Sequence, residues 1–264
     1  HSTRIMQEAA RYQIPVALSC APMAGVTSPI TMAGTLVQTH AEQLAGIAIC
    51  QMTHPGAPVL YGGIPGRANL WNLGYQGGSV ECGMMNAAIH QLANHVNVPN
   101  YNSSGLTDAK IPDAQAGWEK AMTTMLAAMG GSNFVHHAAG MLNCMITVAY
   151  EQFVIDDEII GLSCKVLAGI PTDSEHLALD VIDAAARGAD FIKSAHTMKY
   201  MKTEYFNGNG VTDTKNLDKW AEAGRLDAWM RARDIAKKIL GRSNPVYMPA
   251  EVDSAIRKKY DIRL

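Results

Sequence analysis

Two adjacent histidines, His136 and His137, are the first candidates for chemistry in this sequence. An imidazole exchanges its proton near neutral pH, which suits it to general acid–base work. Both residues fall in the segment 133–138, which is predicted to be a strand, and neighbouring side chains of a strand point to opposite faces. We therefore expect at most one of the two to enter a site. The alternative is that both pack at the rim of a core without a chemical role.

Four aromatic residues lie in or beside loops, although aromatics make up only 6% of the chain. They are Tyr61, Trp71, Tyr75 and Tyr101. The face of an aromatic ring attracts a quaternary ammonium by about 0.5–2 kcal/mol without needing a hydrogen bond from the cation. The four residues therefore predict an aromatic cage for such a cation. The alternative for each of them is that it packs a loop onto the body of the fold.

The segments that carry these residues are rich in small side chains. Residues 61–78 contain six glycines, and the loops at 21–27, 100–110 and 136–140 are built largely from Gly, Ala, Ser and Thr. Small residues let a large planar ligand or a partner protein approach the backbone. The alternative is that these loops are ordinary tight turns.

The loops connect segments that alternate between strand and helix patterns. Strands are predicted over residues 14–21, 57–62, 98–102 and 133–138, and helices over residues 31–53, 80–95, 113–129 and 148–168. Apolar strands that alternate with helices indicate a parallel sheet covered by helices. The pattern predicts four strand–helix units and a doubtful fifth strand at 190–194. It fits either an open doubly wound sheet or about half of a (β/α)8 TIM barrel, which has eight units.

The last third of the chain is predicted to be helical. Asp156, Asp157 and Glu158 fall within the helix at 148–168, and we expect them to face solvent. Residues 172–175 (TDSE) have the spacing of a capping box and predict a helix that runs to Arg187. A further amphipathic helix is predicted over residues 226–240.

The composition limits the kinds of partner. Hydrophobic residues make up 48% of the chain and the formal net charge is −2, so we expect a globular protein with no nucleic-acid partner. Five cysteines without a C-x-x-C pair, and no H-E-x-x-H, predict neither disulfides nor a bound metal. We expect a cytoplasmic protein without a membrane span. A native chain ordinarily starts with Met, so His1 suggests that an upstream segment is absent.

A short string suggests one kind of enzyme. Residues 188–194 (GADFIKS) resemble the strand that carries the Schiff-base lysine of deoxyribose-phosphate aldolases. Lys193 would then lie inside a barrel and attack a carbonyl group. The glycine-rich phosphate loop expected downstream in that family is missing.

A longer resemblance covers almost the whole chain. Blocks of sequence in this chain are similar, in the same order, to the trimethylamine methyltransferase family. The blocks are residues 22–29 (PMAGVTSP), 41–46 (AEQLAG), 55–59 (PGAPV), 107–115 (TDAKIPDAQ), 138–142 (AAGML), 151–159 (EQFVIDDEI), and His196-Thr197 followed by Glu204.

The resemblance implies an α/β fold of the (β/α)8 TIM-barrel type. Full chains of the family are nearly twice as long, so residues 1–200 would form the C-terminal half of the barrel and residues 201–264 a helical extension packed on it. Family members transfer a methyl group from an amine to the cobalt of a corrinoid (cobalamin) that a separate small protein carries. A quaternary ammonium already has a neutral leaving group, so no protein-bound metal is required.

The resemblance also implies a substrate and its contacts. Members that act on trimethylamine carry pyrrolysine, which this sequence lacks. That favours the non-pyrrolysine branch, which acts on glycine betaine or related betaines. His137 stands where a small residue is expected, and it could meet a carboxylate. The expected substrate contacts are His136, His137, Tyr101, Tyr75 and Tyr61, and the residues expected to line the approach of the corrinoid are Gly62, Gly63 and Ser104.

We therefore expect a cytoplasmic enzyme of methylamine metabolism, a betaine:corrinoid-protein methyltransferase that forms a homo-oligomer. Two alternatives remain: the Schiff-base aldolase with Lys193, and a non-catalytic protein that binds a quaternary amine.

Overall fold

A parallel sheet of four strands forms the centre of the molecule. The computed structural model describes residues 1–242 and 247–262. The strands β1 (Val16–Cys20), β3 (Val59–Gly63), β6 (Asn100–Ser103) and β7 (Phe134–His136) lie side by side in chain order. All four strands predicted from the apolar segments are thereby confirmed, with ends that differ by one or two residues.

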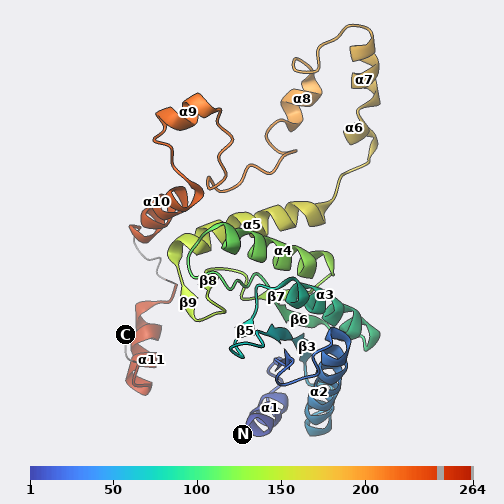
Figure 1. Cartoon of the computed structure of the whole chain (residues 1–264), viewed down its shortest axis with the longest axis vertical. Helices are drawn as coiled ribbons and strands as arrows, with labels where there is room; N and C mark the ends of the chain where they lie inside the picture. The colour runs from blue at the N-terminus through green and yellow to red at the C-terminus, as the bar shows by residue number, and fades with distance from the viewer. Residues whose placement is uncertain (243–246, 263–264) are drawn as a thin grey trace.

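The helices between the strands form one layer. These are α2 (Met32–Thr53), α3 (Val80–His95) and α4 (Ala114–Met129), and α5 (Tyr150–Ala168) follows β7. Each packs on the next, so all four cover the same face of the sheet (Figure 1). The helix α1 (Ser2–Arg11) packs on α2 and β1. Side chains cap two of these helices: Ser79 accepts from the backbone N–H of Cys82, and Asp113 from that of Ala116.

The core lies between this helix layer and the sheet. Tyr61 from β3 packs with Ile89 and Ala93 from α3, and all three are fully buried. A Cβ atom on Gly46 would lie 3.0 Å from Cδ2 of Leu18, so the glycine allows α2 to approach β1 closely.

The other face of the sheet is open. The strand register aligns Ser19, Gly62, Tyr101 and Phe134 across the four strands. Ser19 is exposed, and 53% of Phe134 is exposed. Strands of a parallel sheet are ordinarily buried on both faces. Because the strands follow chain order and their helices share one face, the sheet is singly wound; a doubly wound sheet would reverse its strand order. The sheet has four strands, whereas a TIM barrel has eight.

Short strands structure the loops at the carboxyl ends of the main strands. The strands β2 (Met23–Ala24), β4 (Gly66–Ala68) and β5 (Tyr75–Gln76) form a small sheet, and β8 (Met141–Leu142) pairs with β9 (Thr147–Val148). These short elements follow β1, β3 and β7 in the chain, so two of the loops that we expected to carry function, 21–27 and 61–78, are ordered by strand pairing of their own.

The C-terminal third extends away from this body (Figure 1). Its helices are α6 (Ser174–Leu177), α7 (Leu179–Ala186), α8 (Ala195–Tyr200), α9 (Leu217–Glu222), α10 (Ala228–Leu240) and α11 (Ala250–Lys259). The helix predicted over 226–240 corresponds to α10, which packs against α5. The domain boundary expected after residue 200 falls at the end of α8 and stays a prediction.

Two local predictions in this region are wrong. The helix expected over 172–187 is interrupted at Ala178, which has a left-handed φ of 52°, and Asp173 rather than Thr172 caps its start. No strand forms at residues 190–194; the Asp190 carboxylate instead accepts from the backbone N–H of Ile192 in a turn. A carboxylate that can bond the backbone locally favours such a turn over an extended strand.

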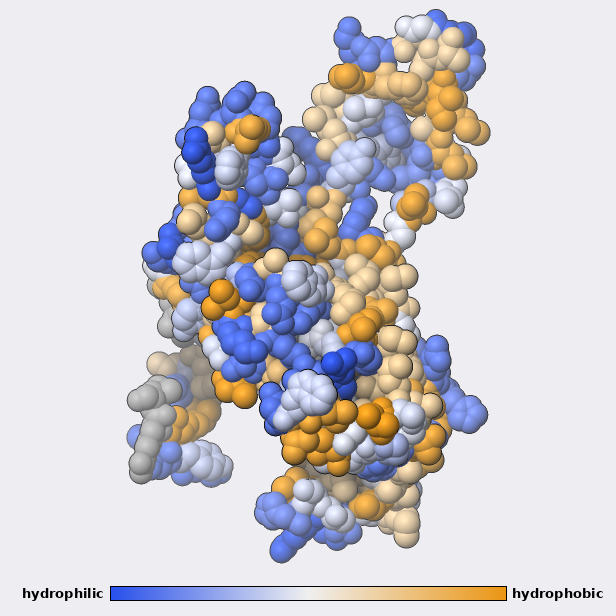
Figure 2. Space-filling model, in the orientation of Figure 1, coloured by the Kyte–Doolittle hydropathy of each residue, from blue (hydrophilic) through white to orange (hydrophobic). Residues whose placement is uncertain are grey.

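The segment from α6 to α8 carries exposed apolar side chains, which Figure 2 shows as orange patches at the top of the molecule. Leu177, Leu179, Ile182 and Phe191 are each about half exposed or more. Helices α6, α7 and α8 have no buried residue. This segment therefore has no core of its own.

Candidate functional site

Polar and aromatic side chains from β6 and β7 meet on the open face of the sheet. The register pairs Tyr101 with Phe134 and Ser103 with His136, so all four residues share that face. The hydroxyl of Tyr101 lies 2.6 Å from Nδ1 of His136. The hydroxyl of Ser103 lies 2.8 Å from Nδ1 of His137. Two hydroxyl–imidazole pairs thus stand next to each other at the carboxyl ends of neighbouring strands.

The two histidines lie together, which corrects the expectation that they would point to opposite faces. Their ring centroids are 3.5 Å apart and the rings are stacked. The reason is that β7 ends at His136, and His137 has a φ of 65°. A left-handed residue breaks the alternation of a strand. Both imidazoles are therefore available to one site.

The stacking has an electrostatic consequence. Burial lowers the pKa of His137 below its ordinary value, and the adjacent His136 lowers it further. A positive charge on one ring would repel a positive charge on the other, which disfavours protonation of His137. His137 is accordingly neutral at neutral pH.

Phe134 extends the site with an exposed aromatic surface. Its ring stacks on Tyr101 at 5.9 Å and on His136 at 6.3 Å between centroids. Sequence reasoning missed Phe134 as a site residue. The signal was present, because Phe134 and His136 are two residues apart in one strand and so share a face.

The other aromatics of the expected cage lie elsewhere. Tyr61 is fully buried on the helix-covered face, where its hydroxyl lies 2.8 Å from Nδ1 of His40 in α2. Burial raises the pKa of Tyr61 to about 12. Trp71 is 94% exposed. The ring of Tyr75 packs on Gly66 in the small sheet, and burial raises its pKa strongly. Of the tyrosines expected to contact substrate, the structure brings only Tyr101 to the two histidines.

Comparison with known proteins identifies the relatives of this chain. A sequence model described as trimethylamine methyltransferase (MTTB) matches residues 2–263. The chain belongs to the trimethylamine methyltransferase family.

Several curated relatives are 36–37% identical to this chain over the residues that align. A trimethylamine methyltransferase MttB of Desulfitobacterium hafniense is 37% identical over 257 residues, which are 97% of this chain and 51% of the relative. A glycine betaine methyltransferase from another strain of that species is 37% identical over 235 residues, 89% of this chain and 49% of the relative. An MttB of Methanosarcina barkeri is 36% identical over 253 residues, 96% of this chain and 50% of the relative. The chain thus spans about half the length of the relatives that it matches.

The three residues that the family resemblance assigned to a corrinoid approach are buried. A Cβ atom on Gly62 would lie 2.7 Å from Cδ1 of Tyr101, and one on Gly63 would lie 2.6 Å from Cδ1 of Ile89. The hydroxyl of Ser104 donates to the carbonyl of Thr123 at 2.5 Å. Packing alone therefore accounts for the small size of the two glycines, and any contact with a corrinoid stays a prediction.

The structure contradicts the aldolase alternative. The side chain of Lys193 is 84% exposed, and its Nζ lies 3.8 Å from the carboxylate of Asp190. The turn at 190–194 places this lysine outside any sheet. A Schiff-base lysine needs a desolvated pocket or a neighbouring cation to lower its pKa, and the surroundings of Lys193 offer solvent and a carboxylate.

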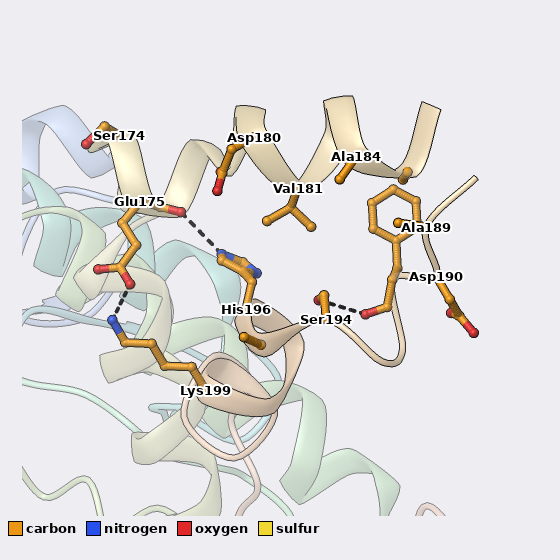
Figure 3. Close-up of a pocket in the computed structure, with 13 residues that line it drawn as sticks. Ser174, Glu175, Asp180, Val181, Ala184, Ala189, Asp190, Ser194, His196 and Lys199 are labelled. Carbon is orange, nitrogen blue, oxygen red and sulfur yellow. Dashed lines mark hydrogen bonds and ion pairs between the residues drawn. The ribbon is translucent and has the colours of Figure 1, made fainter. Parts of the chain in front are cut away.

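A cleft near Lys193 lies between α7 and α8 (Figure 3). It measures about 480 Å³, and Glu175, His196 and Lys199 stand on one side of it. Lys199 forms an ion pair with Glu175, and His196 bonds the backbone carbonyl of the same residue at 3.2 Å. These three residues are thus paired with one another, and the walls of the cleft belong to the segment without a core.

Neither a cluster of metal ligands nor a membrane-spanning helix is found in residues 1–242 and 247–262. No three His, Cys, Asp or Glu side chains among them come together as metal ligands would. Nor does any helix in these ranges have the length and apolar character that crossing a membrane requires.

Proposed function

We propose that the protein containing this chain transfers a methyl group from a quaternary amine that bears a carboxylate, such as glycine betaine, to the cobalt of a corrinoid carried by a separate protein. The observation that supports it most is the pair of stacked histidines beside Tyr101 and Phe134, on the open face of a parallel sheet. The names of the relatives, which include a glycine betaine methyltransferase, support the same reaction class.

The aromatic part of the site suits the cationic end of a betaine. A trimethylammonium group offers no hydrogen-bond donor, so it is held by ring faces. Phe134 is 53% exposed there and its ring stacks on Tyr101, of which 5% is exposed. The methyl groups would lie against these rings.

The imidazoles suit the anionic end. When the hydroxyls of Tyr101 and Ser103 donate to the Nδ1 atoms of His136 and His137, each neutral ring carries its proton on Nε2. Two adjacent Nε2–H groups could then donate to the two oxygens of one carboxylate. The lowered pKa of His137 is compatible with this role, because a neutral ring with Nε2–H is still a donor.

Positioning is the main catalytic task in this scheme. When bound, the corrinoid supplies the nucleophile that accepts the methyl group. The residues of this chain hold the substrate by both ends, and the tertiary amine that leaves is neutral, so no proton has to be supplied to it. The open face would also exclude water once it is covered.

We further infer that the sheet is part of a TIM barrel whose other strands belong to the remaining half of the relatives' length. The order of the strands, the single helix layer and the open face support this inference. The open face would then line the inside of the barrel. The apolar side chains on α6–α8 support a homo-oligomer in which a second copy covers this segment, and sedimentation of the full-length protein tests that expectation.

The decisive assay uses the full-length protein, its corrinoid partner or free reduced cobalamin, and glycine betaine. The expected result is the absorbance change of methylcobalamin formation together with dimethylglycine release. Choline and trimethylamine serve as comparison substrates. Binding of glycine betaine by calorimetry without any methyl transfer would instead identify a non-catalytic binding protein. Absence of both binding and transfer with every quaternary amine would refute the proposal.

A further inference from the structure

A buried ion pair joins two helices directly behind the candidate site. Nζ of Lys120 in α4 lies 3.0 Å from Oδ2 of Asp156 in α5, and the two side chains are 0% and 1% exposed. Asp156 and Glu158 were expected to face solvent, and that expectation is wrong, since they are 1% and 5% exposed. Burial lowers the pKa of Lys120 and raises that of Asp156, while each charge opposes the shift of the other. A buried ion pair of this kind is weak evidence for stability, because desolvation of both charges offsets their attraction.

Both charged groups also bond the backbone of the loops that carry the site. Nζ of Lys120 donates to the carbonyl of Gly105 at 2.5 Å and to that of Met141 at 3.0 Å. The carboxylate of Asp156 accepts from the backbone N–H of Gly140 at 2.7 Å. Gly105 follows β6, whereas Gly140 and Met141 follow β7. The pair therefore ties both loops to the same point.

The two loops touch each other at this point. A Cβ atom on Gly105 would lie 2.8 Å from Cα of Ala138, and Gly105 has a φ of 70°. The backbone N–H of Ser104 donates to the carbonyl of His136 at 3.1 Å. The position of one loop against the other therefore sets whether the Ser103 hydroxyl reaches His137 and the Tyr101 hydroxyl reaches His136.

We propose that Lys120 and Asp156 are positioning residues that hold the stacked pair His136–His137 in register with the hydroxyls of Ser103 and Tyr101. Neither charged side chain contacts the substrate in this account. The effect of these two residues on methyl transfer rests on the proposed function. Their effect on the placement of the histidines does not.

The test measures the histidines themselves in the full-length protein. Exchange of the imidazole C2 hydrogen for deuterium, followed by mass spectrometry, gives the pKa of each histidine. In Asp156→Asn the amide can still bond Gly140 but leaves Lys120 without a counter-ion. We expect the pKa of His137 to rise toward 6.5, because the ring moves away from His136 and toward water. The titratable groups around the two histidines are Tyr101 from β6, which contacts His136, and each histidine for the other.

Two further variants separate positioning from folding. Asp157→Asn is the matched control, since Asp157 adjoins Asp156 on α5 but contacts Asn209 at 2.9 Å in the C-terminal segment. It should leave the pKa of His137 unchanged. The double variant Lys120→Met with Asp156→Leu removes both buried charges and should melt no lower than Asp156→Asn. Its His137 should nevertheless show the same raised pKa as in Asp156→Asn, because the hydrogen bonds from residues 120 and 156 to both loops are lost.

The experiment also measures the rate of methyl transfer by each variant. We expect kcat for glycine betaine to fall by about 100-fold in Asp156→Asn, because a displacement of about 1 Å has that effect on a positioned substrate. An unchanged His137 titration in both Asp156→Asn and the double variant would overturn the positioning role. If the titration shifts as expected while the unaltered protein transfers no methyl group, the proposed function fails and the positioning role stands.

Discussion

His136 and His137 stack at 3.5 Å between ring centroids, although they are consecutive residues at the end of a strand. The left-handed φ of His137 makes this arrangement. It places two imidazoles beside an aromatic surface, and the proposal of a zwitterionic substrate depends on both rings donating from Nε2 to a carboxylate.

Removal of the Tyr101 hydroxyl tests its contact with His136. In Tyr101→Phe the hydrogen bond of 2.6 Å is lost, and with it the control of the His136 tautomer. A hydrogen bond contributes about 0.5–1.5 kcal/mol, so KM for glycine betaine should rise by about 3–10-fold. Steady-state kinetics of the full-length protein measures this change.

Tyr61→Phe is the matched control for that variant. Tyr61 lies in the neighbouring strand but faces the helix layer, where its hydroxyl bonds His40. This variant should lower the free energy of unfolding by about 1 kcal/mol and leave KM unchanged. Equal effects of the two substitutions on KM would contradict the assignment of Tyr101 to the site.

Truncation of His137 tests the contact with the substrate carboxylate. His137→Ala should raise KM for glycine betaine by about tenfold or more, because a hydrogen bond to a charged group is worth about 1.5–3 kcal/mol. Binding of tetramethylammonium, which has no carboxylate, should change much less. Calorimetric titration of both ligands gives the ratio, and an equal loss for the two would exclude a carboxylate contact.

The lowered pKa of His137 predicts a pH dependence of stability. Between its folded and unfolded pKa values the unfolded state binds the proton more tightly. The free energy of unfolding should therefore decrease as the pH falls below about 6.5. Below the pKa that His137 has in the folded protein, this residue should contribute no further decrease. Denaturant titrations at several pH values should show a weaker dependence in His137→Asn, and an identical slope in both proteins would contradict the shift.

Exposure of Lys193 predicts that it has no catalytic role. Lys193→Ala should retain full methyl-transfer activity and a melting temperature within measurement error. Borohydride should trap no carbonyl substrate on the unaltered protein. Trapping that is lost in Lys193→Ala would restore the aldolase alternative.

The sequence predicted the four main strands and the helices between them because their signals are local. Short apolar segments marked the strands, and the helices predicted over 80–95 and 113–129 start at the caps that the structure shows, Ser79 and Asp113. The strand predicted at 190–194 failed because its apolar residues, Phe191 and Ile192, are exposed rather than buried.

The site was harder to predict because it depends on contacts between distant residues. Tyr61 and Tyr101 both looked like loop aromatics, but the strand register turns them to opposite faces. Asp156 looked like one of three acidic residues on a solvated helix, yet its partner Lys120 is 36 residues earlier in the chain. A single sequence carries no local mark of such a pair.

The most direct test is a crystal structure of the full-length protein with glycine betaine. The trimethylammonium group is predicted to lie against Phe134 and Tyr101, with a carboxylate oxygen within hydrogen-bond distance of Nε2 of His136 or His137. Density for the ligand in the cleft between α7 and α8, or at any other place with the Tyr101–His136 surface empty, would contradict the account.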